Sequence, residues 1–209
     1  MRTRISEKND IPQLKALWLQ AFGDEQRFID AFFEDLYRED RCAVIEDEGK
    51  ILSMAYLLPC SLDSRVDASG ALLEGGGIER LKCVYLYGMA TDEAQRGKGL
   101  GLMLLSFIKG YAGALGCEGI ATLPADDKLF GFYKKAGYVE YFEPQPLFDA
   151  PCRLSYPQEV IGFQRKIDAM YGQNSFAKSP MEVSGYRAML RPLSARIPNV
   201  KAHMAIALE

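Results

Sequence analysis

Histidine and tryptophan are nearly missing from this chain, which has one of each among its 209 residues, and its five cysteines are scattered. No two cysteines form a Cys-x-x-Cys pair, so the ligand spacings typical of zinc sites are absent. We therefore expect no metal site, and we interpret the lone histidine, His203, as structural. We expect buried, reduced thiols, which favour a cytoplasmic protein, at Cys42, Cys60, Cys83, Cys117 and Cys152.

Long runs of one residue type are also lacking. Aspartate and glutamate (28) outnumber lysine and arginine (25), and no run of five or more basic residues occurs. This balance argues against nucleic acid as a partner. No apolar stretch approaches the ~18 residues of a membrane span. The polar start of the chain, Met1–Asp10, does not resemble a secretory signal, so we expect no membrane partner and no leader.

A chain of this length, with 48% hydrophobic and 25% charged residues, is typical of one folded domain with a sizeable core. We predict a single domain over residues 1–209, with a core of about residues 1–148. Beyond that core several prolines interrupt the pattern, and we interpret residues 149–209 as an elaboration of the same domain. This part is predicted to contain a helix, Val160–Tyr171, and a final strand, His203–Leu208.

The first quarter of the chain predicts two helices and a hairpin. Apolar residues at helical spacing predict one helix over residues 11–22 and a second, rich in aromatic residues, over residues 24–36. Residues 42–46 and 51–58 are strand-like. The Asp-Glu-Gly-Lys sequence between them is typical of a tight hairpin.

A loop and a strong strand follow the hairpin. Pro59 leaves the strand pattern, and the glycine-rich stretch Asp63–Glu79 predicts a surface loop or a hairpin tip. Residues 81–91 are apolar and aromatic enough for a buried strand. Gly88 interrupts this strand, and a lone glycine in a strand indicates a bulge or a close backbone approach.

The residues that follow this strand predict a helix and then a parallel strand. One face of a helix is marked by apolar residues at helical spacing, Leu104, Phe107, Ile108, Tyr111 and Leu115. A short strand over residues 119–123 is then expected to be parallel to residues 81–91, because a helix separates the two. A helix carrying Tyr133 ends at Gly137, and residues 138–142 form the next strand.

The turn between the strand and the first of these helices, residues 89–101, contains three glycines and two cations. The first turn of a helix has unpaired N–H groups and partial positive charge, so it is suited to a phosphate. Gly99 and Gly101 would let a ligand approach the backbone closely. Arg96 and Lys98 add positive charge. Composition alone leaves open an ordinary turn whose glycines serve packing.

The spacing favours the phosphate site. Residues 96–101 read Arg-Gly-Lys-Gly-Leu-Gly, an Arg-x-x-Gly-x-Gly pattern after a strand and at the start of a helix. The Walker pattern, Gly-x-x-x-x-Gly-Lys-Ser/Thr, occurs nowhere in the chain. The dinucleotide pattern would need glycine at position 102 or 104, and both are leucine.

Two sequence blocks together resemble the GNAT superfamily of acetyl-CoA-dependent N-acetyltransferases. The first is the strand end Met-Ala-Thr followed by Arg-x-x-Gly-x-Gly. The second is Leu129–Tyr138, which resembles the family's Tyr-x-x-x-Gly-aromatic block and follows 37 residues later, from Arg96 to Tyr133. The resemblance covers residues 1–148 in layout and residues 81–138 in detail.

The resemblance implies the fold and the cofactor site. The fold class is α/β (α+β), with a twisted, mostly antiparallel sheet, a central parallel strand pair splayed at a β-bulge, and flanking helices. The cofactor is acetyl-CoA, whose pantetheine arm fills the splay near Gly88. Tyr133 is the implied catalytic acid or hydrogen-bond donor to sulfur, with oxyanion donors at Met89 or Ala90. The implied cofactor-binding residues are Met89, Ala90, Thr91, Arg96, Gly97, Lys98, Gly99, Leu100, Gly101 and Leu102.

Two positions depart from the family pattern. Asp126 replaces an asparagine often found seven residues before the tyrosine, and a carboxylate cannot donate as an amide does. Glu93 replaces a proline that shapes only the turn. The general base is not identified, and water remains an alternative to the four candidates, Glu79, Tyr85, Tyr87 and Asp92.

The resemblance leaves the acceptor open. A primary amine on a small molecule, a peptide or a protein is expected, and a homodimer is compatible with the sequence. Four aromatic residues of the second helix region either pack in the core or line the acceptor groove: Phe28, Phe32, Phe33 and Tyr37. Two other functions remain as alternatives, a non-catalytic acyl-CoA binding module and an unrelated α/β nucleotide-binding protein.

Overall fold

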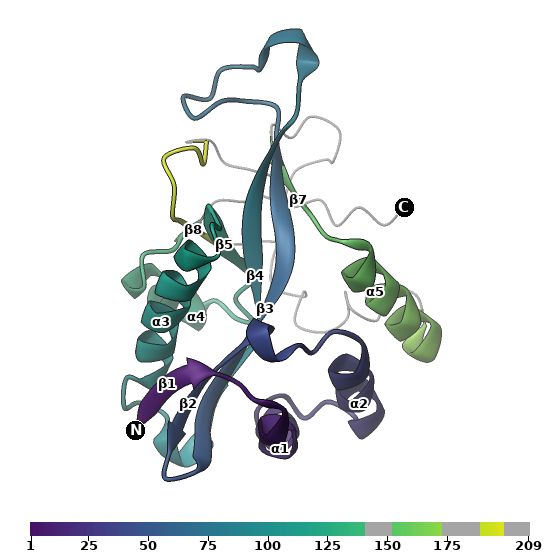
Figure 1. Cartoon of the computed structure of the whole chain (residues 1–209), viewed down its shortest axis with the longest axis vertical. Helices are drawn as coiled ribbons and strands as arrows, with labels where there is room; N and C mark the ends of the chain where they lie inside the picture. Colours follow the sequence, from purple (N-terminus) through teal and green to yellow (C-terminus); the bar gives the residue numbers. More distant parts are fainter. Residues whose placement is uncertain (141–151, 173–188, 199–209) are drawn as a thin grey trace.

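The structure is a computed structural model, and it describes residues 1–140, 152–172 and 189–198. One twisted sheet with helices on both faces forms the molecule (Figure 1). The strands are β1 (Arg2–Ile5), β2 (Cys42–Asp47), β3 (Lys50–Ser64), β4 (Glu79–Thr91), β5 (Gly119–Thr122), β6 (Val139–Glu140), β7 (Cys152–Ser155) and β8 (Met189–Pro192). The helices are α1 (Ile11–Phe22), α2 (Gln26–Asp35), α3 (Leu100–Ala114), α4 (Lys128–Lys135) and α5 (Gln158–Tyr171).

The sheet has the order β1-β2-β3-β4-β5-β8-β6, and β7 pairs with the distal end of β3. Among the described strands, β4 and β5 form the only parallel pair, and all other neighbours are antiparallel. A helix separates β4 from β5, as parallel pairing requires. The predicted mixed sheet with a central parallel pair is therefore confirmed.

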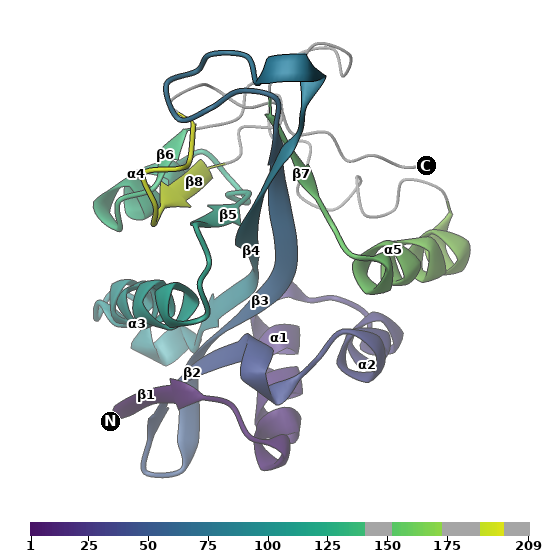
Figure 2. The same cartoon turned by 45° about the horizontal axis from the view of Figure 1, so that its top comes forward.

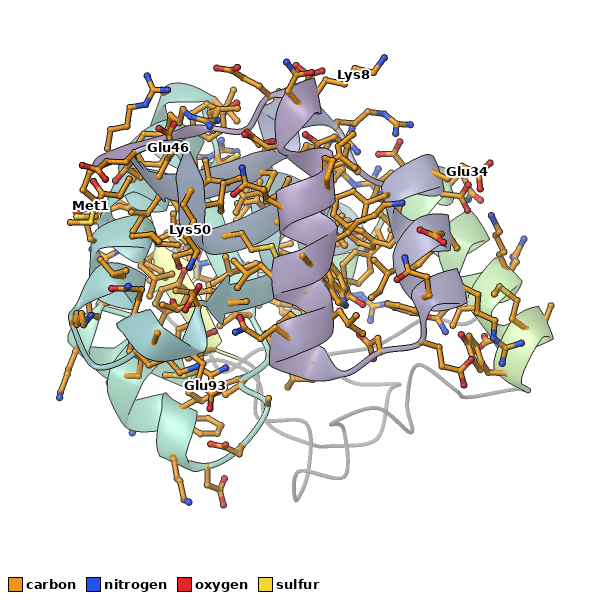
Figure 3. All side chains as sticks on the ribbon, turned by 90° about the horizontal axis from the view of Figure 1, so that it is seen from below. Met1, Lys8, Glu34, Glu46, Lys50 and Glu93 are labelled. Carbon is orange, nitrogen blue, oxygen red and sulfur yellow. The ribbon has the colours of Figure 1, made fainter. Side chains whose placement is uncertain are left out.

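Two hydrophobic clusters, one on each face of the sheet, make up most of the core. Side chains of α1, α2 and α5 pack on one face, around the fully buried Phe32 and the nearly buried Trp18. Side chains of α3 and α4 pack on the other face, around Leu104 and Ile108. Figure 2 shows the two helix groups on opposite sides of the long β3–β4 ribbon. In Figure 3, α1 is seen crossing in front of the strands.

The predicted hairpin and the predicted end of the first helix are confirmed. Asp47 pairs with Lys50, so the turn between β2 and β3 has two residues, Glu48 and Gly49, both with positive φ. Gly23 ends α1 in the left-handed conformation at φ 68°. Each of the five cysteines is free and buried, as expected from their scattered positions.

The strand β3 is longer than predicted. The prediction that Pro59 ends the strand pattern is wrong, because Pro59 pairs with Val84 and β3 continues to Ser64. On the other edge of β3, pairing with β2 stops at Tyr56 and pairing with β7 starts at Ser61. Pro59 lies in this gap, so its missing N–H leaves no ladder bond unmade. The predicted loop shortens to residues 65–78, at the top of Figure 1.

Three strands were not predicted: β1, β7 and β8. The strand β8 lies between β5 and β6, so the C-terminal region completes the sheet itself. The helix α5 matches its prediction closely. The predicted final strand, His203–Leu208, and residues 141–142 of the predicted strand 138–142 lie outside the described residues.

Candidate acyl-coenzyme A site

A β-bulge interrupts β4 at the predicted glycine. Tyr87 pairs with Tyr56 and Ala90 pairs with Met54, so β4 has one residue more than β3 across this interval. Gly88 lies inside the bulge with φ 58°, a backbone conformation that residues other than glycine rarely adopt. Neither Gly88 nor Met89 has a partner in the β3–β4 register. The backbone at Gly88 and Met89 therefore does not pair with β3.

The parallel pair ends just before the bulge. The last pair is Tyr85 with Ala121, and one residue later β5 ends at Thr122. The Thr122 hydroxyl donates to the carbonyl oxygen of Leu86 at 3.3 Å. From this point the edge of β4 that faces β5 has no strand partner among the described residues. A ligand arm that forms strand-like hydrogen bonds fits this opening.

Tyr133 lies on α4 next to the end of the parallel pair. Its side chain is buried, and its ring contacts Phe132 and Tyr138 with centroid separations of 5.1 and 5.3 Å. Burial raises the pKa of the phenol, and a hydrogen bond with the Thr122 side chain partly opposes that rise. Tyr133 is therefore a neutral hydrogen-bond donor at neutral pH, beside the opening between β4 and β5.

The glycine turn has the conformation expected of an anion site. Gly97 and Gly99 have φ of 78° and 81°, and a Cβ at either position would meet nothing within 4 Å. Gly99 is the N-cap of α3 and supplies no side-chain cap. Within the described chain, no acceptor bonds the backbone N–H groups of residues 97–102. These N–H groups, at the positive end of a 15-residue helix, are available to a diphosphate.

Not every predicted cofactor contact faces open space. A Cβ at Gly101 would lie 2.9 Å from the Phe132 ring and 3.3 Å from the Met89 Cε atom, so this glycine serves helix packing. Leu100 is buried in the core, whereas Leu102 is 37% exposed at the surface of α3. The sequence alone did not separate these roles, because they depend on where α4 packs.

The polar side chains near the turn bond within the chain. Arg96 Nε donates to the Thr91 carbonyl oxygen at 3.2 Å, and Lys98 Nζ donates to Gln95 Oε1 at 2.8 Å. The Thr91 hydroxyl lies 2.9 Å from the Ser53 hydroxyl. Asp126 accepts from the Leu129 N–H at 3.1 Å, so its carboxylate satisfies an N–H at the start of α4. This local bond gives Asp126 a structural role at the helix start.

The opposite face of the bulge is aromatic. A Cβ at Gly88 would lie 3.1 Å from Trp18 Cζ3, so the indole packs against the bulge. The indole N–H donates to Asp24 Oδ2 at 2.7 Å. Tyr85 and Tyr87 pack on this same face, with ring centroids 6.4 Å apart. The sequence placed Trp18 on the apolar stripe of the first helix and Asp24 at the start of the second, but it did not link either residue to the bulge, because only tertiary packing brings them there.

The aromatic residues of the second helix region divide between the two predicted roles. Phe32 is fully buried, and Phe33 and Tyr37 are less than a tenth exposed, so these three belong to the core. Phe28 is partly buried, and its ring lies 6.2 Å from that of Trp18. Of the four residues, Phe28 alone is partly exposed, so it alone is available to contact an acceptor.

Two of the four candidate bases are engaged elsewhere. Glu79 pairs with Ser64 at the far end of β4 and forms an ion pair with Arg196. Gly88 lies nine positions further along the chain, which is about 30 Å of strand. Asp92 forms an ion pair with Lys50 at 2.7 Å and accepts from the Ala94 N–H. Tyr85 and Tyr87 remain near the bulge.

Comparison with known proteins agrees with this geometry. A family model described as the acetyltransferase (GNAT) family matches residues 10–138, more than half of the chain. The chain belongs to the GNAT family. The matched segment contains the bulge, the glycine turn and Tyr133, and the GNAT assignment predicted from the two sequence blocks is confirmed. A search of curated proteins finds no significant match.

Solved structures, among them GNAT proteins, share the fold. The Escherichia coli GNAT family N-acetyltransferase YhbS, in complex with CoA, has a TM-score of 0.58 at 16% identity, covering 97% of this chain and 87% of that one. Rv2747 from Mycobacterium tuberculosis, also solved with CoA, has a TM-score of 0.56 at 16% identity, covering 93% and 100%. A GCN5-related N-acetyltransferase from Anabaena variabilis has a TM-score of 0.54 at 17% identity, covering 68% and 32%. This GNAT chain thus spans about a third of the Anabaena protein.

No described helix has the length and apolar character needed to cross a membrane. Within the same residues, no three histidine, cysteine, aspartate or glutamate side chains gather as metal ligands would.

Proposed function

We propose that this GNAT protein is an N-acetyltransferase that moves an acetyl group from acetyl-CoA to a primary amine by direct attack in a ternary complex. One observation carries the proposal. The bulge at Gly88 and the phenol of Tyr133 adjoin the opening between β4 and β5. The start of α3, with the unpaired N–H groups of residues 97–102, packs at Gly101 against Met89 of the bulge and against Phe132, the neighbour of Tyr133. The CoA found in the YhbS and Rv2747 structures supports the choice of cofactor.

Residues 97–102 would hold the cofactor through backbone N–H groups directed at the diphosphate. The positive end of α3 favours these negative charges. Gly97 and Gly99 have no side chain and face open space, so a ligand can approach the backbone there. Met89 and Ala90 would provide backbone contacts at the bulge. When bound, acetyl-CoA supplies a thioester that a neutral amine can attack.

The chain's own groups would assist the transfer of the acetyl group from sulfur to nitrogen. An N–H at Met89 or Ala90 would donate to the acyl oxygen as negative charge develops there. Tyr133 would donate its phenolic hydrogen bond to the departing sulfur. Because burial keeps the pKa of this phenol above that of a thiol, Tyr133 acts chiefly as a hydrogen-bond donor. The proton lost by the amine would leave through Tyr85, Tyr87 or water.

The acceptor would approach from the aromatic face, opposite α3 and α4. Trp18, Phe28 and Tyr87 lie beside the bulge on that face. We propose a primary amine of a small molecule, a peptide or a protein as the acceptor. The five reduced, buried cysteines fit the proposed cytoplasmic location.

The decisive experiment combines ligand binding with thiol release. Acetyl-CoA is expected to raise the melting temperature, and a panel of primary amines is expected to include members that accelerate release of free CoA. Protection without amine-dependent release would instead identify an acyl-CoA binding module. Failure of both CoA and acetyl-CoA to protect the protein would overturn the cofactor assignment and favour an unrelated nucleotide-binding protein.

A further inference from the structure

Asp24 lies in the link between α1 and α2, where its carboxylate is partly buried. Its Oδ2 atom accepts a hydrogen bond from the indole N–H of Trp18 at 2.7 Å. No other hydrogen bond and no ion pair reaches this carboxylate within the described part of the chain. The N-cap of α2 is Glu25, so Asp24 does not cap that helix. The Oδ1 atom of Asp24 is therefore left for another donor.

Asp24 differs in this respect from the most deeply buried aspartates of the described chain. Each of those three forms an ion pair with a cationic side chain: Asp10 with Arg4 at 2.6 Å, Asp63 with Arg80 at 2.9 Å and Asp92 with Lys50 at 2.7 Å. A carboxylate that is withdrawn from water without a cation costs free energy. At Asp24, the described chain does not supply the cation.

The cations nearest to Asp24 along the sequence are held by other carboxylates. Arg27 Nε donates to Glu25 Oε2 at 2.7 Å. Lys15 Nζ donates to Asp30 Oδ1 at 2.6 Å. Neither side chain neutralises Asp24, whereas a cation brought by a ligand would do so.

Aromatic rings surround the indole to which Asp24 is bonded. The ring centroids of Phe22, Tyr87 and Phe28 lie 5.5, 5.8 and 6.2 Å from that of Trp18. Phe22 is 44% exposed, and Phe28 and Tyr87 are partly exposed, so a ligand can reach this cluster. Burial raises the pKa of the Tyr87 phenol and the charge of Asp24 adds to the rise, so the carboxylate lies near this phenol. Aromatic faces beside a carboxylate favour an ammonium group.

The indole joins Asp24 to the bulge. Its six-membered ring lies against Gly88, where a Cβ would lie 3.1 Å from Cζ3 and 3.2 Å from Cη2. Its five-membered ring carries the N–H that bonds Asp24. Asp24 is therefore separated from the bulge by roughly the width of one indole. One small molecule with several bonds between its two ends could contact both places.

We propose that Asp24, with the aromatic rings around Trp18, binds a second ammonium group of the acceptor, so that the preferred substrate is a primary diamine with a short alkyl chain. This role of Asp24 rests on the proposed function, because the reacting amine must lie at the bulge. One nitrogen, as the neutral amine, attacks the thioester. The other stays protonated and donates to Oδ1 of Asp24 while its charge lies over the aromatic faces. An alkylamine with a single nitrogen lacks this contact.

The test compares diamines with alkylamines of the same chain length on the full chain. Release of free CoA from acetyl-CoA is measured with the terminal diamines of butane, pentane and hexane, and with butylamine, pentylamine and hexylamine. The variant Asp24→Asn removes the negative charge and keeps an oxygen that accepts from the indole N–H, so the packing of Trp18 is preserved. In a second arm, each diamine is titrated by calorimetry into the protein without acetyl-CoA.

The matched control is Glu74→Gln, which also removes one negative charge. Glu74 is exposed in the loop of residues 65–78, at the top of Figure 1, whereas α1 and α2 lie at the bottom. It forms no ion pair within the ranges that the structure describes. The control separates the Asp24 contact from a general weakening of the attraction for cations. Melting temperature and CoA affinity report whether each variant folds and binds the cofactor as wild type does.

Wild type and Glu74→Gln are expected to prefer diamines. Their kcat/KM for the best diamine should be at least tenfold above that for the matching alkylamine, well beyond the roughly twofold advantage of having two amines. Asp24→Asn should lose this preference, chiefly through a higher KM for the diamine. No such preference in wild type, or the same preference in Asp24→Asn, would overturn the proposal.

The titration keeps the role of Asp24 separate from the proposed function. If wild type releases no CoA with any of the primary amines, the proposed function fails, and the second arm decides the role of Asp24. Binding of a diamine to wild type and Glu74→Gln but not to Asp24→Asn would then support an ammonium site. Absence of binding to wild type, or equal binding to Asp24→Asn, would overturn it.

Discussion

The indole of Trp18 lies directly against the backbone of Gly88, at the one point where β4 leaves its ladder with β3. A Cβ at Gly88 would lie 3.1 Å from the Cζ3 atom of Trp18 and 3.3 Å from the ring of Tyr56. The bulge therefore has an aromatic support on the face of the sheet opposite α3. This contact joins the first helix of the chain to the opening between β4 and β5.

Gly88→Ala is expected to destabilise the protein and to reduce cofactor binding. The substitution adds a Cβ at φ 58° and within 3.2 Å of the Trp18 ring, so either the bulge or the indole must shift. A left-handed conformation alone costs a residue other than glycine about 1–2 kcal/mol. Melting temperature and acetyl-CoA affinity measure the two effects. Wild-type values for both would contradict the role given to the bulge.

Gly99→Val is expected to abolish CoA binding while the protein still folds. The new side chain would be strained at φ 81° and would project into the open space where the diphosphate is proposed. Gly113→Ala, inside α3 and also facing open space, is the matched control. It should raise stability by roughly 0.5–1 kcal/mol and leave CoA binding unchanged. Retained CoA binding by Gly99→Val would argue against a diphosphate site at residues 97–102.

Tyr133→Phe is expected to lower kcat at least tenfold with little change in CoA affinity. The variant keeps the ring contacts with Phe132 and Tyr138 and removes only the hydroxyl beside Thr122. A tenfold loss corresponds to about 1.4 kcal/mol of transition-state stabilisation. Steady-state kinetics and calorimetry together make the test. Unchanged turnover would refute the role of Tyr133.

The activity of the wild-type enzyme should not decline through ionisation of Tyr133 below about pH 10. Burial raises the pKa of this phenol above its ordinary value of 10.0, so the hydrogen-bond donor persists through the neutral and mildly alkaline range. A pH profile of kcat for wild type and Tyr133→Phe checks this expectation. A fall below pH 10 that disappears in Tyr133→Phe would contradict it.

Acid should destabilise the protein through Glu46. Arg2 and Arg4 donate to its carboxylate at 2.8 and 2.9 Å and hold the pKa of Glu46 at about 2, against 4.5 for the free side chain. A depressed pKa gives stability that is present above pH 4.5 and is lost as the pH falls toward 2. Glu46→Gln should be less stable than wild type at pH 7 and should lose less stability across that window.

The control for Glu46→Gln is Glu93→Gln. Glu93 is exposed and lies well away from Glu46 in Figure 3. It forms no ion pair within the described part of the chain. Thermal unfolding between pH 2 and 7 should therefore show the wild-type slope for Glu93→Gln. An equal slope for Glu46→Gln and wild type would contradict the role of the arginines.

The local sequence pattern was sufficient to predict most of the helices and strands between residues 11 and 138. The helical stripe of α1, the two-residue turn at Glu48 and Gly49, and the bulge at Gly88 all follow from residues close together in the sequence. The helical spacing of apolar residues did not predict burial correctly at the end of α3. Leu115, predicted to belong to the buried face of α3, is 43% exposed at its C-cap, where the helix no longer packs on the sheet.

The sequence by itself determined the order of strands and helices between residues 11 and 138, the glycine turn and the positions of the two family blocks, because each depends on neighbours within a few residues. Only the tertiary structure decided that β8 enters the sheet, that Trp18 supports Gly88 and that Asp24 lies near Tyr87. Those contacts join residues tens of positions apart, and their free energy comes from burial and charge that exist only once the chain has folded back on itself.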